Sequence, residues 1–286
     1  MAEGQITAAY GRQFLVELTD GSTVPCVTRG KKGGAACGDR VTIQMTSPNQ
    51  GVIDTIAPRQ ALLFRSDAFR EKLIAANVTQ IVAVVAAFPS FYEELLSRCL
   101  IAAEATGIKA LIVLNKCDMV QESAATRARL ELYTSLGYSL LPLSATQDVM
   151  PLRPWLQNET SVLVGQSGMG KSSIINALLP DEVQVRTQEI STALNSGRHT
   201  TTHAQLYHLD ANSHIIDSPG LQEFGLHHLS REDIEYAFVE FRPFLGHCRF
   251  NDCKHGVEPG CALLQAVAQG KISPRRLEAY YKLRSS

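Results

Sequence analysis

Residues 161–173 read Ser161-Val162-Leu163-Val164-Gly165-Gln166-Ser167-Gly168-Met169-Gly170-Lys171-Ser172-Ser173. A short apolar strand is followed by the pattern G-x-x-x-x-G-K-S and then by a helical pattern, which is the arrangement of a phosphate-binding P-loop. The glycines permit a loop whose backbone N–H groups turn toward a phosphate chain, and the helix adds its positive N-terminal end. The stretch therefore predicts a P-loop α/β unit.

Within this unit we expect Lys171 to act as the catalytic cation that bridges the β- and γ-phosphates, and Ser172 to ligate Mg²⁺. Downstream, Asp217-Ser218-Pro219-Gly220 follows an apolar strand and fits D-x-x-G. Asp217 would hold Mg²⁺ through water, and the N–H of Gly220 would contact the γ-phosphate. The whole loop is expected in the nucleotide site, namely Gly165, Gln166, Ser167, Gly168, Met169, Gly170, Lys171, Ser172 and Ser173.

The base site is predicted by Asn115-Lys116-Cys117-Asp118, at the end of the apolar strand 110–114. The Asp118 carboxylate can accept from both N1–H and the exocyclic amine of guanine, whereas adenine would leave it unpaired. The stem of Lys116 would cover the base, and Ser144-Ala145 would add contacts near the guanine oxygen. These residues favour GTP over ATP and argue against a P-loop kinase or ATPase.

The order of these motifs is unusual. In Ras-like GTPases the P-loop comes first, but here residues 115–118 and 144–145 precede residues 165–172, which precede residues 217–220. The same sheet can still form if the old termini are joined, because domain termini often lie close together. We therefore predict a circularly permuted GTPase domain with a mostly parallel sheet.

On the N-terminal side, short runs rich in β-branched residues alternate with turn signals, which predicts a small barrel. The OB-fold is the commonest five-stranded kind, and an SH3-like barrel is the alternative. The expected strands are 6–10, 14–18, 23–28, 40–45 and 51–56. From residue 81 strands and helices alternate, with strands at 81–88, 110–114, 138–143, 161–164 and 214–216 and helices at 93–106, 124–136 and 171–179.

After Gly225 the pattern becomes helical. Ser230 and Asp233 resemble a capping box that opens a helix to about residue 241, and Ser273-Pro274 precedes a helix at 275–283. A dense Cys/His cluster lies between them. The predicted architecture is a multidomain α/β protein with an OB-like barrel at 1–60, the permuted GTPase domain at 61–226 and a helical zinc-binding domain at 227–286.

The composition limits the partners and the location that the protein can have. The chain has 286 residues, a net charge of −1 and 7 Cys, so no global charge draws it toward nucleic acid. We see no signal peptide, and the apolar runs are too short to span a bilayer. A cytoplasmic protein with no membrane contact and reduced cysteines is expected. We interpret the scattered Cys26, Cys37, Cys99 and Cys117 as packing residues.

With these motifs in this order, the sequence resembles the circularly permuted ribosome-assembly GTPases of the RsgA (YjeQ) family. The resemblance covers nearly the whole chain and rests on residues 115–118, 165–173, Gly197-Arg198-His199-Thr200-Thr201-Thr202, 217–220 and the Cys/His cluster. It implies hydrolysis of GTP to GDP stimulated by the small (30S) ribosomal subunit, a role in its late maturation, and contacts of the barrel with ribosomal RNA. We also expect the C-terminal zinc domain to contact that RNA. The protein is expected to be a monomer.

The Cys/His cluster predicts one structural Zn²⁺. Cys248, Cys253, His255 and Cys261 form a Cys₃His set with the spacing C-x4-C-x-H-x5-C, and four protein ligands close a tetrahedral shell. His247 competes for the histidine position, and the family pattern favours His255.

Leu221 stands where Ras-like enzymes carry the Gln that orients the attacking water, so another residue must take that role. Our hypothesis is His199, with His203, Gln222 and Glu223 as alternatives. The alternative for His199 itself is a contact with phosphate or RNA, or no functional contact. One residue of Thr200–Thr202 should ligate Mg²⁺; we include Thr201 in the nucleotide site and leave the ligand open. The rival function is an RNA-binding module with a non-hydrolytic nucleotide site.

Overall fold

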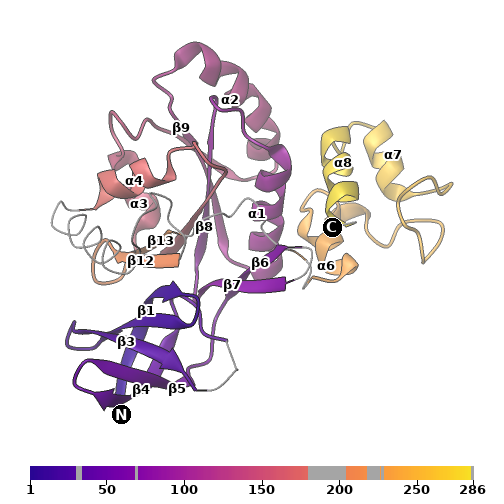
Figure 1. The fold of residues 1–286 in the computed structure, drawn as a ribbon. Coiled ribbons are helices and arrows are strands. Elements are labelled where there is room, and N and C mark those ends of the chain that lie inside the picture. Colours follow the sequence, from indigo (N-terminus) through magenta and orange to yellow (C-terminus); the bar gives the residue numbers. More distant parts are fainter. Residues whose placement is uncertain (30–33, 68–69, 180–203, 218–225, 227–228, 285–286) are drawn as a thin grey trace.

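The computed structural model describes residues 1–29, 34–67, 70–179, 204–217, 226 and 229–284. Within these ranges the chain forms an N-terminal barrel, a central α/β unit and a C-terminal helical unit (Figure 1). No helix in the described ranges is both long and apolar enough to cross a bilayer.

The barrel contains five strands, all close to the predicted positions: β1 (Ala2–Tyr10), β2 (Gln13–Leu18), β3 (Thr23–Thr28), β4 (Arg40–Ser47) and β5 (Gln50–Ile56). Hydrogen bonding follows the order β1-β2-β3-β5-β4, and β1 also pairs with β4 and closes the barrel. β3 and β5 run parallel. This order confirms the OB-like barrel, and alternate residues such as Ile6, Val16 and Ile43 form a core of their own.

A hairpin of β6 (Leu62–Asp67) and β7 (Arg70–Ala76) follows the barrel. This hairpin was not predicted from the sequence. The backbone of β7 contacts the barrel where the N–H of Ala76 donates to the carbonyl of Cys37.

The central unit is a sheet in the order β10-β9-β8-β11-β13-β12, in which only β12 is antiparallel to its neighbour. Its elements are β8 (Gln80–Ala86), α1 (Glu93–Thr106), β9 (Lys109–Asn115), α2 (Val120–Ser135), β10 (Ser139–Pro142), α3 (Arg153–Leu156), β11 (Thr160–Val164), α4 (Lys171–Leu178), β12 (Ala204–His208) and β13 (His214–Asp217). The predicted parallel sheet and helices are confirmed. β12 was not predicted.

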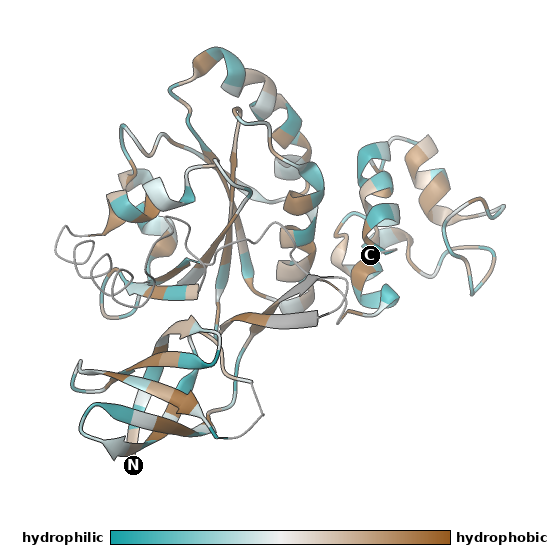
Figure 2. Ribbon diagram, viewed as in Figure 1, coloured by the Kyte–Doolittle hydropathy of each residue, from teal (hydrophilic) through white to brown (hydrophobic). Residues whose placement is uncertain are grey.

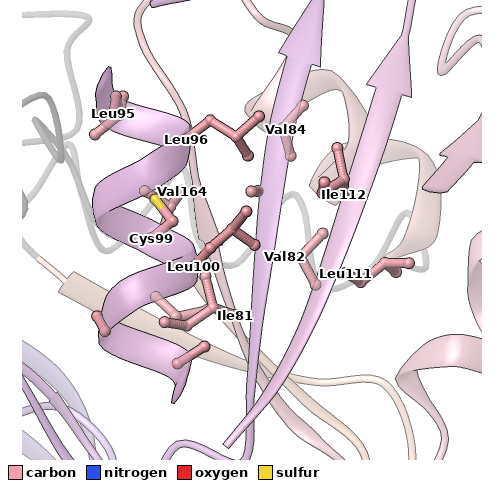
Figure 3. Close-up of a cluster of buried hydrophobic side chains, with 14 of the residues drawn as sticks. Ile81, Val82, Val84, Leu95, Leu96, Cys99, Leu100, Leu111, Ile112 and Val164 are labelled. Carbon is pink, nitrogen blue, oxygen red and sulfur yellow. The ribbon is translucent and has the colours of Figure 1, made fainter. Parts of the chain in front are cut away.

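The core explains why these segments are strands and helices. Every residue of β8 is buried, as expected for a strand covered on both faces. α1 packs on it with Leu96 and Leu100, which lie four residues apart on one face of the helix and face Val82 and Val84 (Figure 3). Figure 2 shows the same contrast between apolar strands and polar outer helix faces. The sheet is therefore a rigid base for the loops at its edge.

The C-terminal unit contains α6 (Arg231–Ala237), a 3₁₀ turn (Arg242–Phe244), α7 (Ala262–Ala268) and α8 (Pro274–Leu283). The predicted capping box of Ser230 and Asp233 is present, but α6 is shorter than expected. Ser273 is the N-cap residue of α8, although its side chain makes no capping bond. The unit lies against α1 (Figure 1), where Arg242 pairs with Glu104 at 2.6 Å.

The barrel and the central unit share one sheet. β1 pairs with β12 antiparallel through Ala8 with Gln205 and Ala9 with Ala204. The result is a continuous sheet of 11 strands. The domain boundaries expected after residues 60 and 226 stay predictions.

Candidate functional site

The expected site residues gather at one edge of the central sheet. Because β8, β9, β10, β11 and β13 run parallel, their carboxyl ends meet there. Asn115 ends β9, Gly165 follows β11 and Asp217 ends β13. Open α/β sheets bind ligands outside the carboxyl ends of their strands.

The phosphate-binding loop has a backbone that requires glycine. Gly168 and Gly170 have φ values of 81° and 89°, in the left-handed region. A Cβ on Gly170 would collide with Nδ2 of Asn115. Gly170 is also the N-cap residue of α4, and Ser172 and Ser173 lie exposed in the first turn of that helix. The loop therefore presents a helix N-terminus toward the sheet edge.

Lys171 lies over this loop. Its ammonium donates to the carbonyl of Gly165 at 2.6 Å and to that of Gln166 at 3.0 Å. Burial lowers the pKa of Lys171, and the charge of Asp217 opposes that shift. Burial in turn raises the pKa of Asp217, which is 8% exposed, while Lys171 lowers it. The Lys171 ammonium and the Asp217 carboxylate thus share a poorly hydrated site, which suits binding of phosphate together with Mg²⁺.

Asn115 connects the phosphate side to the base side. It is 2% exposed, its Nδ2 donates to the carbonyl of Met169 at 2.9 Å, and its Oδ1 accepts from the N–H of Ala145 at 3.0 Å. One side chain therefore sets the separation of the phosphate-binding loop from the loop after β10.

Asp118 and Ser144 form the base side. The Ser144 hydroxyl donates to Oδ1 of Asp118 at 2.6 Å and lies 3.0 Å from the hydroxyl of Thr146. Asp118 is exposed, so its carboxylate is open to a ligand. Lys116 has a left-handed backbone with φ of 62°, and its ammonium donates to the carbonyl of Phe88 at 2.9 Å. The structure thus brings together the residues that the sequence assigned to guanine.

The Gln166 side chain makes two contacts that were not predicted from the sequence. Its Oε1 accepts from the N–H of Tyr92 at 2.6 Å, and its Nε2 donates to the carbonyl of Ser90 at 3.0 Å. The P-loop pattern specifies backbone at this position, so it carries no signal for a side-chain role.

The metal cluster is assembled in the C-terminal unit. Ligand atoms of Cys248, Cys253, His255 and Cys261 all lie within 4.8 Å of one another. Nδ1 of His255 lies 3.5 Å from the sulfur of Cys248 and 3.4 Å from that of Cys261. His247 is exposed and lies outside the cluster. This donor set suits one tetrahedral metal ion.

A carboxylate supports the histidine from behind. Glu235 on α6 lies 3.7 Å from Nε2 of His255 and also pairs with Arg231 at 2.7 Å and with the hydroxyl of Tyr280. Burial alone would raise the pKa of Glu235, but hydrogen bonds from His255, Tyr280 and Arg231 lower it to about 2. An ionised carboxylate on Nε2 directs Nδ1 toward a metal. Glu235 was not predicted as a partner of the metal cluster.

Several expected residues lie outside the described ranges. They are His199, Thr200, Thr201, Thr202, His203, Gly220, Leu221, Gln222 and Glu223. Their expected roles stay predictions.

Comparison with known proteins agrees with this geometry. Residues 56–227 match the sequence profile of the RsgA GTPase. The small ribosomal subunit biogenesis GTPase RsgA of Nitrosospira multiformis is 59% identical over 99% of this chain and 90% of its own length. The protein of the same name from Nitrosomonas europaea is 53% identical, over 98% and 90%.

Two solved structures are similar over nearly the whole chain. YjeQ from Thermotoga maritima has a TM-score of 0.73 at 28% identity and covers 99% of this chain and 97% of its own. YloQ, described as a circularly permuted GTPase, has a TM-score of 0.71 at 28% identity and covers 100% and 94%.

Proposed function

Because the chain belongs to the RsgA family of GTPases, we propose that it binds the small ribosomal subunit and hydrolyses GTP to GDP and phosphate during late maturation of that subunit. The observation that carries the nucleotide part of this proposal is the Asn115 amide, which joins the phosphate-binding loop to the loop that contains Ala145. A P-loop alone accepts several nucleotides, whereas this connection supports a single site in which the Asp118 carboxylate would select guanine.

The nucleotide roles follow from the positions of the side chains. Lys171 would leave its loop carbonyls for the β- and γ-phosphates and offset charge that develops on them during transfer. The Ser172 hydroxyl and, through water, Asp217 would hold Mg²⁺, which neutralises phosphate charge when it is bound. The burial that shifts the pKa values of Lys171 and Asp217 also strengthens these charge interactions.

Guanine selectivity would come from Asp118. One of its oxygens accepts from Ser144, so the carboxylate is held in place before the base arrives. Guanine offers both N1–H and the adjacent exocyclic amine to a carboxylate. Adenine has an acceptor at N1 and no amine in that position. Preorganisation of this kind lowers the cost of binding the correct base.

His199 remains our candidate for orienting the attacking water. The motivation is the sequence alone, because Leu221 stands where Ras-like enzymes carry Gln. Either Thr201 or one of its two neighbours would complete the magnesium shell.

The C-terminal cluster would hold one Zn²⁺ in a structural role. Three thiolates and one imidazole fit zinc by ligand type, and four protein ligands leave no position for a substrate. Glu235 orients the imidazole, so Glu235 and its partners Arg231 and Tyr280 belong to the support of this site.

We assign contacts with ribosomal RNA to the barrel and the C-terminal unit. We also propose that the protein is a monomer and is located in the cytoplasm, together with its ribosomal partner.

Phosphate release from GTP, measured with and without purified small subunits, tests the function. We expect slow release by the protein alone, faster release with subunits, and neither with Lys171→Ala. Turnover that is absent under both conditions, with GTP and GDP bound equally well, would support the rival RNA-binding module instead. Displacement of labelled GDP by ATP would count against the base assignment.

A further inference from the structure

The loop between β8 and α1 packs against the phosphate-binding loop. The Gln166 side chain fills the contact and is 7% exposed. Both ends of its amide are used, since Oε1 accepts from the N–H of Tyr92 and Nε2 donates to the carbonyl of Ser90. Pro89 supports the contact, because its Cγ lies 3.2 Å from the position of a Cβ on Gly168.

The bond to Tyr92 falls at the start of a helix. Tyr92 is the N-cap residue of α1, and its own side chain makes no capping hydrogen bond. The first N–H groups of a helix have no partner within it and need an acceptor from elsewhere. The phosphate-binding loop supplies one to α1 through Gln166.

The first turn of α1 is also the docking edge for the C-terminal unit. Glu93, next to Tyr92, pairs with Arg275 of α8 and accepts from the hydroxyl of Tyr133 at 3.1 Å. One turn later, the Ser97 hydroxyl lies 3.4 Å from Nη1 of Arg276, a side chain that is 1% exposed. The helix that Gln166 holds at its start thus carries contacts with α8.

We propose that Gln166 is a positioning residue: it keeps the first turn of α1 in register with the phosphate-binding loop and thereby transmits nucleotide occupancy to the Glu93–Arg275 contact. The inference rests on the proposed function for its ligand, a guanine nucleotide. It describes a route through packed side chains. A route of this kind needs direct coupling evidence.

Hydrogen exchange of the full chain with its metal, with and without saturating GDP and Mg²⁺, gives that evidence. In the parent protein we expect GDP to slow exchange over residues 165–172, 90–97 and 274–283. Gln166→Leu should keep the slowing over 165–172 at saturation and lose it over the other two segments. The expected loss is roughly fivefold to tenfold in exchange rate, the scale of one hydrogen bond.

Gln80→Leu is the matched control. Gln80 is also a buried glutamine with two hydrogen bonds, since it accepts from Ser161 at 2.9 Å and donates to the carbonyl of Trp155 at 3.1 Å. It lies at the start of β8, at the opposite end of the sheet from the phosphate-binding loop. General loss of stability should affect both variants alike, so only a specific role separates them.

A second pair of variants removes the same bond from the other side. Tyr92→Pro deletes the N–H and leaves Gln166 intact, and its φ of −85° at the N-cap is close to what proline adopts. Tyr92→Ala keeps the N–H and removes only an exposed ring. We expect Tyr92→Pro to behave as Gln166→Leu does and Tyr92→Ala to behave as the parent does.

The inference is overturned if Gln166→Leu or Tyr92→Pro retains the parent slowing over 274–283. It is also overturned, while the proposed function stands, if the parent protein binds GDP without any change in hydrogen exchange over residues 274–283. Failure of the parent to bind GDP would overturn the proposed function, and the inference with it.

Discussion

Replacing Asn115 with Ala should weaken binding of GDP and GTP to the same extent. The side chain holds the Met169 carbonyl at 2.9 Å and the Ala145 N–H at 3.0 Å, and it is 2% exposed. Its removal frees the phosphate-binding loop from the base-binding loop. The nucleotide would then have to order both loops on its own.

The magnitude follows from these two bonds. A buried backbone group that loses its partner costs about 1–3 kcal/mol, so two such groups amount to roughly 2–6 kcal/mol. Part of this cost falls on the nucleotide-free protein as lost stability. We assign about 2–4 kcal/mol to binding, which corresponds to a roughly 30- to 1,000-fold increase in Kd.

The assay is titration of a fluorescent GDP analogue and its displacement by unlabelled GDP or GTP. Asn77→Gly serves as the control, because Asn77 makes the same two kinds of bond: Nδ2 donates to the Gly38 carbonyl at 3.0 Å and Oδ1 accepts from the Gln60 N–H at 3.0 Å. Glycine also accommodates its φ of 58°. The reasoning would be refuted if the Kd of Asn115→Ala were within threefold of the parent value. It would also be refuted if that Kd were no higher than the Kd of the Asn77→Gly control.

Four further predictions concern other parts of the chain. Asp118→Asn should shift preference from guanine toward xanthine nucleotides, because its amide donates where guanine also donates; unchanged GTP affinity in a competition assay would remove Asp118 from the base site. Freshly purified protein should contain about one zinc per chain, and replacing two of the four ligands with Ser should unfold the local loop yet spare GDP binding; metal analysis that finds none contradicts this. His199→Ala should lower kcat at saturating small subunits while GTP affinity is kept; normal turnover at saturation would mark a docking or bystander histidine. Burial and the neighbouring His208 lower the pKa of His214 below its ordinary 6.5. The unfolded chain therefore binds its proton more readily, and the stability that neutral His214 contributes should be lost as pH falls from about 6.5 toward the folded pKa. The difference in Tm between pH 7.5 and 5.5 should shrink in His214→Asn, and an equal difference in both proteins would count against it.

The sequence was most informative where local pattern and burial coincide. The strands β8, β9 and β11 are continuous apolar runs because both faces of the sheet are covered, so their type and position followed directly. The phosphate and base motifs also lay where expected, since each follows the carboxyl end of a strand.

Elements that depend on partners far along the chain were missed. β12 reads Ala-Gln-Leu-Tyr-His, a short half-polar run that becomes a strand because β13 and β1 pair with it. The β6–β7 hairpin has little apolar periodicity of its own.

The side chains that support the site were missed for a similar reason. Glu235 acquires its role from His255 and Tyr280, which are distant in sequence. The pattern that predicts the P-loop leaves the residue at position 166 unspecified, so only the packed structure shows the contact with Tyr92.

The pairing of β1 with β12 covers a strand edge that would otherwise be exposed. In the central sheet β10 and β12 are the outermost strands. β10 spans four residues and ends at Pro142, which makes it a poor template for another chain. β12 has no such feature, and Ala8 and Ala9 of the barrel occupy its outer edge instead. A chain shortened to begin after the barrel would expose that edge, and self-association through β12 is the expected result.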